Sequence, residues 1–376
     1  MFAIAAPSFN APSETFIRDH VRLIAPGRTV LICREGGEEL FDCPVLSGIS
    51  SWSPPRTLFD RVTNAARQRW SRYIDRSLFF DDHCRVVDFL RSNRVEVLLA
   101  EFLNTGVQYI RACREADVRL FVHAHGYDVN ILAEDWSWRR AYRRLFRTNA
   151  TIIAGSQFLR RKIIDLGAAP SQVIYSPLGV NLCREMQPPC PAEPLILCVS
   201  RLILQKGVDL SIRSFSRILL KYPNARLEIV GDGPCRSQLE KLVADLGIGG
   251  SVIFFGSRPH EFVLERLGRA SALVQHCITL PGQGIESFGL SVVEAMGAGL
   301  PVVVTKHGAF AELIADGQTG FLVGEGDIEA MTDRVVGLLA DPIRARAIGD
   351  AARKYVLAHF TQRHASERLR SVLGLT

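Results

Sequence analysis

Short apolar runs alternate with helical stretches along the whole chain, and this alternation restricts the fold more than any other feature of the sequence. Short runs rich in Val, Ile, Leu and Phe are typical of buried strands. Strands that alternate with helices are typical of parallel sheets covered by helices. A chain of 376 residues is too long for one ordinary core. We therefore predict an α/β protein with two doubly wound, Rossmann-like domains.

Twelve runs are predicted to be strands, six in each half of the chain. They are residues 2–6, 29–33, 95–99, 120–123, 151–154 and 173–175, then 195–199, 226–230, 252–255, 272–275, 302–304 and 321–323. Between the two sets, residues 183–194 contain four prolines, a composition typical of a linker. We place the first domain at 1–185 and the second at 186–358, followed by a C-terminal helix within 359–376.

The bulk composition is that of an ordinary globular protein, with 47% hydrophobic and 22% charged residues. No run approaches eighteen apolar residues, and the first residues have no basic segment, so we expect neither a transmembrane helix nor a signal peptide. Nine cysteines without a CxxC pair predict reduced thiols and a cytoplasmic protein. The net charge of +6 falls mainly in residues 1–190, where 25 Lys and Arg face 20 Asp and Glu.

Residues 281–304, PGQGIESFGLSVVEAMGAGLPVVV, carry the strongest functional signal. A glycine-rich turn precedes Ser287, a predicted N-cap, and a helix that ends near Gly297 and Gly299 before a buried strand. A helix start favours a phosphate through its free N–H groups and its dipole. Glu286 before that start and Glu294 inside the helix could hold hydroxyls on either side of a diphosphate. A nucleotide-sugar has this layout.

The motif continues through GAFAEL at 308–313 and DGQTGFLV at 316–323. The whole region resembles the E-x7-E signature of the family 4 glycosyltransferases, which are retaining sugar-transfer enzymes. The resemblance implies the GT-B architecture, in which two Rossmann-like domains face each other across a cleft. In that architecture the last helix commonly crosses back to the first domain, and residues 359–376 are the candidate for it; a helix on its own domain is the alternative. The resemblance also implies that Glu294 holds the ribose, that Glu286 holds the donor sugar, and that the backbone of Phe288, Gly289 and Leu290 holds the distal phosphate.

Two cations follow the predicted strand 195–199, in the segment SRLILQKG. The planar guanidinium of Arg201, which can donate two parallel hydrogen bonds, and the compact ammonium charge of Lys206 both suit a diphosphate. Neither residue has an evident partner in the sequence. The resembled family carries both cations here and borders the nucleotide base with the loop that contains Arg258. Because the chain has no DxD pair, we expect no metal and no cofactor besides the nucleotide-sugar itself.

Gly231-Asp232-Gly233-Pro234 looks like the start of a dinucleotide fingerprint. Arg236 occupies the position of the third glycine and Pro234 interrupts the turn, which disfavours an NAD-dependent oxidoreductase. We interpret the segment as a structural turn.

The first domain offers His123-Ala-His125-Gly126-Tyr127-Asp128 after a strand. His125 matches the family histidine that contacts the transferred sugar, and Asp128 could cap the next helix. His123 and His125 could be a metal pair, but the sequence shows no third ligand, so His123 is interpreted as a hydrogen-bonded core histidine. Weaker acceptor-side candidates are Asp128 itself and, in other loops, Ser13, Glu14, Asn104 and Gly106.

Residues 136–147 combine five arginines with four aromatic residues, and residues 56–76 add further arginines. Such helices can lie on an anionic membrane, so we expect peripheral contact with the inner face of the plasma membrane. The alternative is an exposed helix whose aromatic side chains pack inward. The stretches belong to no recognisable nucleic-acid module, and we expect no nucleic-acid partner.

The combined prediction is a retaining, metal-independent glycosyltransferase. It would move a sugar from a nucleotide-diphosphate sugar to a glycan or lipid-linked acceptor in cell-surface or exopolysaccharide biosynthesis. Two alternatives share the fold: a nucleotide-sugar epimerase and a catalytically silent nucleotide-binding scaffold.

Overall fold

The computed structural model describes residues 1–10, 15–35, 40–49, 76–181 and 193–375. The chain divides into two compact units, which are described separately. The first unit is Met1–Pro177 with Ala365–Thr376, and the second unit is Leu178–His364. The boundary predicted near residue 185 lies outside the described residues, and the predicted cleft between the domains stays a prediction.

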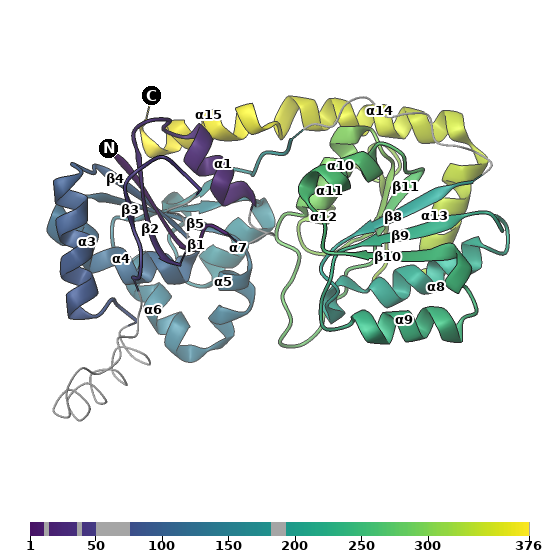
Figure 1. The fold of residues 1–376 in the computed structure, drawn as a ribbon, viewed down its shortest axis with the longest axis horizontal. Helices are drawn as coiled ribbons and strands as arrows, with labels where there is room; N and C mark the ends of the chain where they lie inside the picture. Colours follow the sequence, from purple (N-terminus) through teal and green to yellow (C-terminus); the bar gives the residue numbers. More distant parts are fainter. Residues whose placement is uncertain (11–14, 36–39, 50–75, 182–192, 376) are drawn as a thin grey trace. The chain divides into compact units, whose positions relative to one another are not determined.

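A parallel sheet of seven strands forms the centre of the first unit, in the order β3-β2-β1-β4-β5-β6-β7 (Figure 1). The strands are β1 (Phe2–Ser8), β2 (Thr29–Glu35), β3 (Val45–Leu46), β4 (Val97–Glu101), β5 (Arg119–Ala124), β6 (Thr151–Ala154) and β7 (Val173–Tyr175). The helices are α1 (Thr15–Leu23), α3 (Phe80–Ser92), α4 (Leu103–Ala116), α5 (Tyr127–Asn130), α6 (Trp136–Phe146), α7 (Gln157–Asp165) and α15 (Gln362–Leu373).

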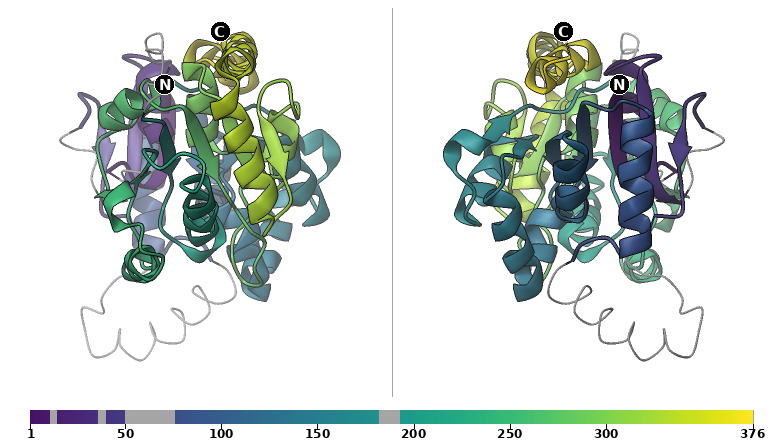
Figure 2. Two further views of the ribbon diagram at one scale, coloured as in Figure 1. Left: turned by 90° about the vertical axis from the view of Figure 1, so that its right-hand side faces the viewer. Right: turned by 90° about the vertical axis from the view of Figure 1, so that its left-hand side faces the viewer.

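The second unit is built around a parallel sheet of six strands in the order β10-β9-β8-β11-β12-β13. The strands are β8 (Leu195–Val199), β9 (Arg226–Val230), β10 (Val252–Gly256), β11 (Ala272–Gln275), β12 (Val302–Thr305) and β13 (Phe321–Val323). The helices are α8 (Val208–Ile218), α9 (Arg236–Asp245), α10 (His260–Leu267), α11 (Leu290–Ala298), α12 (Phe310–Leu313), α13 (Ile328–Ala340) and α14 (Pro342–His359). Helices flank the sheet in each unit (Figure 2).

The predicted α/β class with two doubly wound domains is therefore confirmed. Every predicted strand forms, and the structure adds the two-residue strand β3. The strands are nearly continuous apolar runs because helices cover both faces of a parallel sheet. The C-terminal helix predicted within 359–376 forms as α15, which begins at Gln362 shortly after α14 ends at His359. In the first unit, Arg119 donates to the carbonyl oxygen of Leu373 at 3.3 Å.

The strand order of each sheet reverses once. In the first unit this happens between β1 and β4, and in the second unit between β8 and β11. Ligands of open parallel sheets bind outside the carboxyl ends of the strands at such a reversal. These two places therefore locate the candidate functional residues.

Candidate active site

Lys206 and Glu286 meet beyond the carboxyl ends of β8 and β11. Lys206 Nζ lies 2.5 Å from Glu286 Oε2, and each side chain is 14% exposed. Burial alone would raise the pKa of Glu286, but the charge of Lys206 and its hydrogen bond outweigh burial and lower it. Burial would lower the pKa of Lys206, and Glu286 reverses this and raises it. The expectation that Lys206 has no partner was therefore wrong.

The second oxygen of Glu286 is also engaged. Glu286 Oε1 accepts from the backbone N–H groups of Ser287 at 3.0 Å and Phe288 at 3.3 Å. A carboxylate held by one ammonium group and two amides has a fixed orientation and few free lone pairs. Such a group can accept a hydrogen bond from a ligand hydroxyl in one defined direction.

Two residues that the sequence analysis did not select hold the backbone of Glu286. The Glu286 N–H donates to His307 Nε2 at 3.2 Å, and His307 Nδ1 lies 2.8 Å from Glu325 Oε1. Since Nε2 accepts, Nδ1 carries the proton and donates to Glu325. The Glu286 carbonyl in turn accepts from the N–H of Ala309 at 3.0 Å. His307 directly precedes the GAFAEL motif, which was the only signal for it in the sequence.

The helix start beside Glu286 differs in detail from the prediction. Helix α11 begins at Leu290 with Gly289 as its N-cap residue, so Ser287 is not the N-cap. The Ser287 hydroxyl donates instead to the carbonyl oxygen of Ile285 at 3.2 Å. The first N–H groups of α11 have no carbonyl partner within the helix, which leaves a place for an anion.

Glu294 lies in α11 and pairs with a histidine of the neighbouring helix α10. His260 Nε2 lies 2.8 Å from Glu294 Oε1, with the two side chains 26% and 12% exposed. No role was predicted for His260 from the sequence. Arg258, two residues earlier, is exposed, and its guanidinium lies 5.6 Å from the ring centre of Phe262. Arg201 is exposed as well.

The GDGP segment supports the loop that carries Arg201. Leu202 N–H donates to the carbonyl oxygen of Asp232 at 2.9 Å, and a Cβ on Gly231 would lie 1.9 Å from the carbonyl oxygen of Ser200. Gly231 also has a φ of +136°, which side chains disfavour. The segment is a tight structural turn, as interpreted from the sequence.

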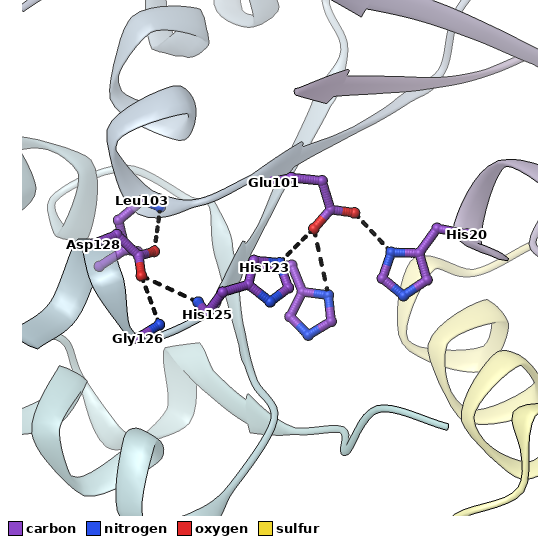
Figure 3. Close-up of polar contacts among 7 residues, drawn as sticks. All are labelled: His20, Glu101, Leu103, His123, His125, Gly126 and Asp128. Atoms are coloured by element: carbon purple, nitrogen blue, oxygen red, sulfur yellow. Dashed lines mark hydrogen bonds and ion pairs between the residues drawn. The ribbon is translucent and has the colours of Figure 1, made fainter. Parts of the chain in front are cut away.

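The first unit gathers four ionisable residues, which we call the histidine cluster: His20, Glu101, His123 and His125 (Figure 3). Glu101 ends β4 and is paired in register with His123 on β5. Neighbouring partners in parallel strands present their side chains on one face of the sheet. Helix α1 brings His20 to the same place.

Glu101 is the centre of the histidine cluster and is fully buried. Its Oε1 lies 2.7 Å from His20 Nδ1, and its Oε2 lies 2.6 Å from His125 Nε2. Burial alone would raise the pKa of Glu101, but His20 and the hydrogen bond from His125 hold it well below its ordinary value. Glu101 is therefore a carboxylate at neutral pH.

His123 is buried beside this carboxylate, with Nδ1 at 3.7 Å from Glu101 Oε2. Neither of its ring nitrogens has a hydrogen-bond partner among the described residues. Burial and then the neighbouring His125 lower the pKa of His123 well below its ordinary value, so the ring is neutral. The prediction that His123 is a buried core residue is confirmed. The prediction that its ring is hydrogen-bonded is wrong for the described residues.

The ring of His125 is held between two aromatic side chains. Its ring centre lies 4.3 Å from that of Phe16 and 4.9 Å from that of Phe102. Phe102 has a φ of +74°, a conformation that costs free energy in a residue with a large side chain. His125 therefore has one defined position. Its contact with a transferred sugar stays a prediction.

The acceptor-side candidates have different surroundings. Asp128 is fully buried and accepts from the N–H groups of Leu103, the first residue of α4, and of Gly126, at 2.7 Å and 2.8 Å; it is not the N-cap of α5 as expected, because Gly126 holds that position. A Cβ on Gly106 would lie 2.5 Å from Val122 Cγ2, which indicates a packing role. Asn104 Oδ1 is buried without a partner among the described residues. Ser13 and Glu14 lie outside the described residues.

Comparisons with known proteins agree with this geometry. Residues 186–355 match the family model described as glycosyl transferases group 1, and residues 19–179 match the glycosyl transferase 4-like domain. A mannosyltransferase of Mycolicibacterium smegmatis, named as GDP-mannose-dependent and acting on a phosphatidylinositol monomannoside, is 30% identical over 272 residues, 68% of this chain and 70% of that protein. The chain belongs to the family 4 glycosyltransferases.

Other similar proteins fit the same family. The amylovoran biosynthesis glycosyltransferase AmsK of Erwinia amylovora is 28% identical over 257 residues, 66% of this chain and 62% of that protein. The structure of the Anabaena protein HepE with UDP and glucose has the same fold, with a TM-score of 0.79, 18% identity and full coverage of both chains. This glycosyltransferase therefore has the GT-B fold. None of its described helices is long and apolar enough to cross a membrane.

Proposed function

We propose that this glycosyltransferase transfers a sugar from a nucleotide-diphosphate sugar to a hydroxyl group with retention of anomeric configuration, and that no metal bridges the diphosphate. The observation that carries the proposal is the Lys206–Glu286 pair beside the start of α11. A cation, an oriented carboxylate and a helix N-terminus stand together at the reversal of strand order, where a diphosphate and its sugar would bind.

Each group has a proposed role at the donor. Arg201 and Lys206 stabilise the diphosphate as charge develops on it, and the first N–H groups of α11 bind its distal phosphate. Glu294 accepts hydrogen bonds from the ribose hydroxyls, and Glu286 accepts from the sugar. The exposed Arg258 lies near the base. The assignment of these roles follows the family resemblance, and the ion pairs support it.

The proposed reaction breaks the bond between the anomeric carbon and the diphosphate oxygen and forms a bond to the acceptor oxygen on the same face of the sugar. The acceptor proton passes to the leaving phosphate oxygen. Glu286 is a poor nucleophile because Lys206 and two backbone N–H groups occupy its oxygens. This favours a mechanism without a covalent glycosyl–enzyme intermediate.

The names of the relatives suggest the acceptor class. One relative is named for a phosphatidylinositol mannoside and another for the polysaccharide amylovoran. We therefore propose a glycan or lipid-linked acceptor in cell-surface polysaccharide or glycolipid synthesis, and a cytoplasmic enzyme at the inner face of the plasma membrane.

Helix α6 supports membrane contact through charge. Its arginines Arg139, Arg140 and Arg143 are exposed, as is Arg147 directly after the helix, whereas the aromatic residues Tyr142 and Phe146 are buried. The interaction should therefore be electrostatic and weakened by salt. Sedimentation with anionic vesicles at low salt tests it: Arg140→Glu/Arg143→Glu should remain in the supernatant. Wild-type protein that fails to sediment would refute membrane contact. The basic stretch 56–75 lies outside the described residues.

Calorimetry tests the donor site. UDP, GDP, ADP and dTDP, with NAD as control, are titrated without divalent metal into wild type, into Arg201→Ala/Lys206→Ala, and into the matched control Arg217→Ala/Lys221→Ala, whose residues are exposed. We expect one nucleoside diphosphate to bind to wild type and control but not to the site variant. Binding of none would exclude the transferase. Isomerisation of a nucleotide-sugar without acceptor would identify an epimerase instead.

A further inference from the structure

The histidine cluster of the first unit contains more nitrogen donors than its carboxylate can use. Three imidazole rings surround Glu101, and only His20 and His125 form hydrogen bonds with it. His123 is 1% exposed, and both of its ring nitrogens lack a partner among the described residues. Because an unsatisfied buried polar atom destabilises the folded state, a ligand that bound this ring would stabilise the fold.

We infer that His20, Glu101 and His123 form a binding site for one divalent transition-metal ion, of which zinc fits best. One ligand atom from each residue lies within 4.8 Å of the others. From the sequence alone, no third ligand at a suitable spacing was evident beside His123 and His125. The fold brings two further ligands beside His123, namely Glu101 at the end of β4 and His20 on α1. This inference does not depend on the proposed function.

The donor set favours zinc over a hard cation. Imidazole nitrogen and carboxylate oxygen are zinc ligands, whereas magnesium requires about six oxygen ligands, most of them water. Glu101 Oε1 and His20 Nδ1 are 2.7 Å apart, and Glu101 Oε2 and His123 Nδ1 are 3.7 Å apart. The rings of His20 and His123 are stacked with their centres 5.3 Å apart, so rotation of the rings would be needed to direct both nitrogens at one zinc ion. The ion would take the place of the hydrogen between His20 Nδ1 and Glu101, and His20 would bind it as a neutral imidazole that carries its proton on Nε2.

His125 would not be a ligand in this arrangement. Its Nε2 is hydrogen-bonded to Glu101 Oε2 at 2.6 Å, and a group bonded to a metal-bound carboxylate is held in a fixed orientation. The metal would therefore fix Glu101, and Glu101 would fix the ring of His125. The metal would stabilise the first unit and position the histidine that the family resemblance places at the sugar.

Zinc binding to the metal-stripped full-length chain tests the inference. Zinc chloride alone is titrated in a calorimeter without nucleotide, and bound zinc is counted by elemental analysis after gel filtration. We expect one zinc per chain, no binding of magnesium, and the visible absorption of tetrahedral cobalt when cobalt replaces zinc. Loss of an outer contact to a metal ligand weakens binding about 10–100-fold, so His123→Ala should weaken it by at least about 100-fold.

His83→Ala is the matched control. His83 Nε2 lies 2.7 Å from Glu115 Oε2, the same pairing as in the cluster, but without a third ligand among the described residues. This variant should bind zinc like wild type. Equal binding by wild type and His123→Ala would show that zinc binds without His123 and would overturn the inference.

Thermal unfolding covers the case in which His123→Ala does not fold. Zinc should raise the Tm of wild-type protein because it binds only the folded state. An unchanged Tm would overturn the inference without any variant.

Discussion

Replacing Lys206 by Met tests the Lys206–Glu286 pair through stability. The substitution leaves the Glu286 carboxylate 14% exposed without its ammonium partner. Removing one member of a buried pair costs about 3–5 kcal/mol. Because Glu286 keeps two backbone N–H donors, we expect the lower end of that range, about 3 kcal/mol. The double variant Lys206→Met/Glu286→Gln should recover part of this loss.

The chain provides a matched control and a way to follow each unit. Lys241 Nζ lies 3.0 Å from Asp245 Oδ2, but these side chains are 77% and 59% exposed, so Lys241→Met should cost less than about 0.5 kcal/mol. All four tryptophans lie in the first 138 residues, so tryptophan fluorescence reports the first unit only. In urea, Lys206→Met should shift the transition seen by far-ultraviolet circular dichroism far more than the transition seen by fluorescence.

The pH dependence of the Lys206→Met effect follows from the two pKa shifts. The lowered pKa of Glu286 gives stability above its ordinary 4.5, which is lost as the pH falls through the lowered value. The raised pKa of Lys206 gives stability below its ordinary 10.5, which is lost as the pH rises through the raised value. The effect of the variant should therefore be largest between these limits. A Lys206→Met chain no less stable at pH 7 than Lys241→Met would refute the reasoning.

Three further predictions concern the same unit. Gly308→Ala should destabilise the protein by at least about 3 kcal/mol, because its Cβ would lie 2.0 Å from a backbone carbonyl oxygen at a φ of +54°. Gly317→Ala, with a φ of +74° and open space, should cost only about 1–2 kcal/mol in the same urea titration. His307→Ala should lower kcat by about tenfold or more with little change in nucleotide affinity, since it removes a backbone support at 3.2 Å. Glu325→Gln should retain most activity because its amide oxygen still accepts from His307; a loss as large as that of His307→Ala would contradict this role. Glu294→Gln should weaken nucleoside diphosphate binding about tenfold in calorimetry and leave pyrophosphate binding unchanged; equal weakening of both would exclude a ribose contact.

The sequence predicts the helices and strands of this chain well. It predicts poorly which side chains from different elements come into contact. Each predicted strand forms within two residues at either end because a buried parallel strand is a continuous apolar run with sharp limits. Helix α11 was placed correctly, but its first residue was not. Ser287 is a good N-cap type, yet its hydroxyl donates to the carbonyl oxygen of Ile285, and the helix begins only at Leu290 with Gly289 as its N-cap residue.

The residues of the histidine cluster that come from distant parts of the sequence were missed for a different reason. Asn104 and Gly106 were predicted as acceptor-side residues from the loop after the strand at 95–99, whereas Glu101 in the same segment was not. His20 lies on the apolar face of α1, where a single histidine looks like part of the core. Only the parallel register that pairs Glu101 with His123 brings these residues together, and no local pattern encodes that pairing.

The negative charges of the two buried carboxylates, Glu286 and Glu101, are compensated in different ways. In the second unit, Glu286 is matched by one ammonium and two amides, so its charge is compensated without a further ligand. In the first unit, Glu101 is compensated by His20 and His125, and the buried ring of His123 remains without a bond among the described residues. Packing alone does not favour an imidazole there, because an apolar side chain would fill the space without the cost of two unsatisfied nitrogens. A ring that can bind a cation beside a fixed carboxylate gives that imidazole a physical reason to be there.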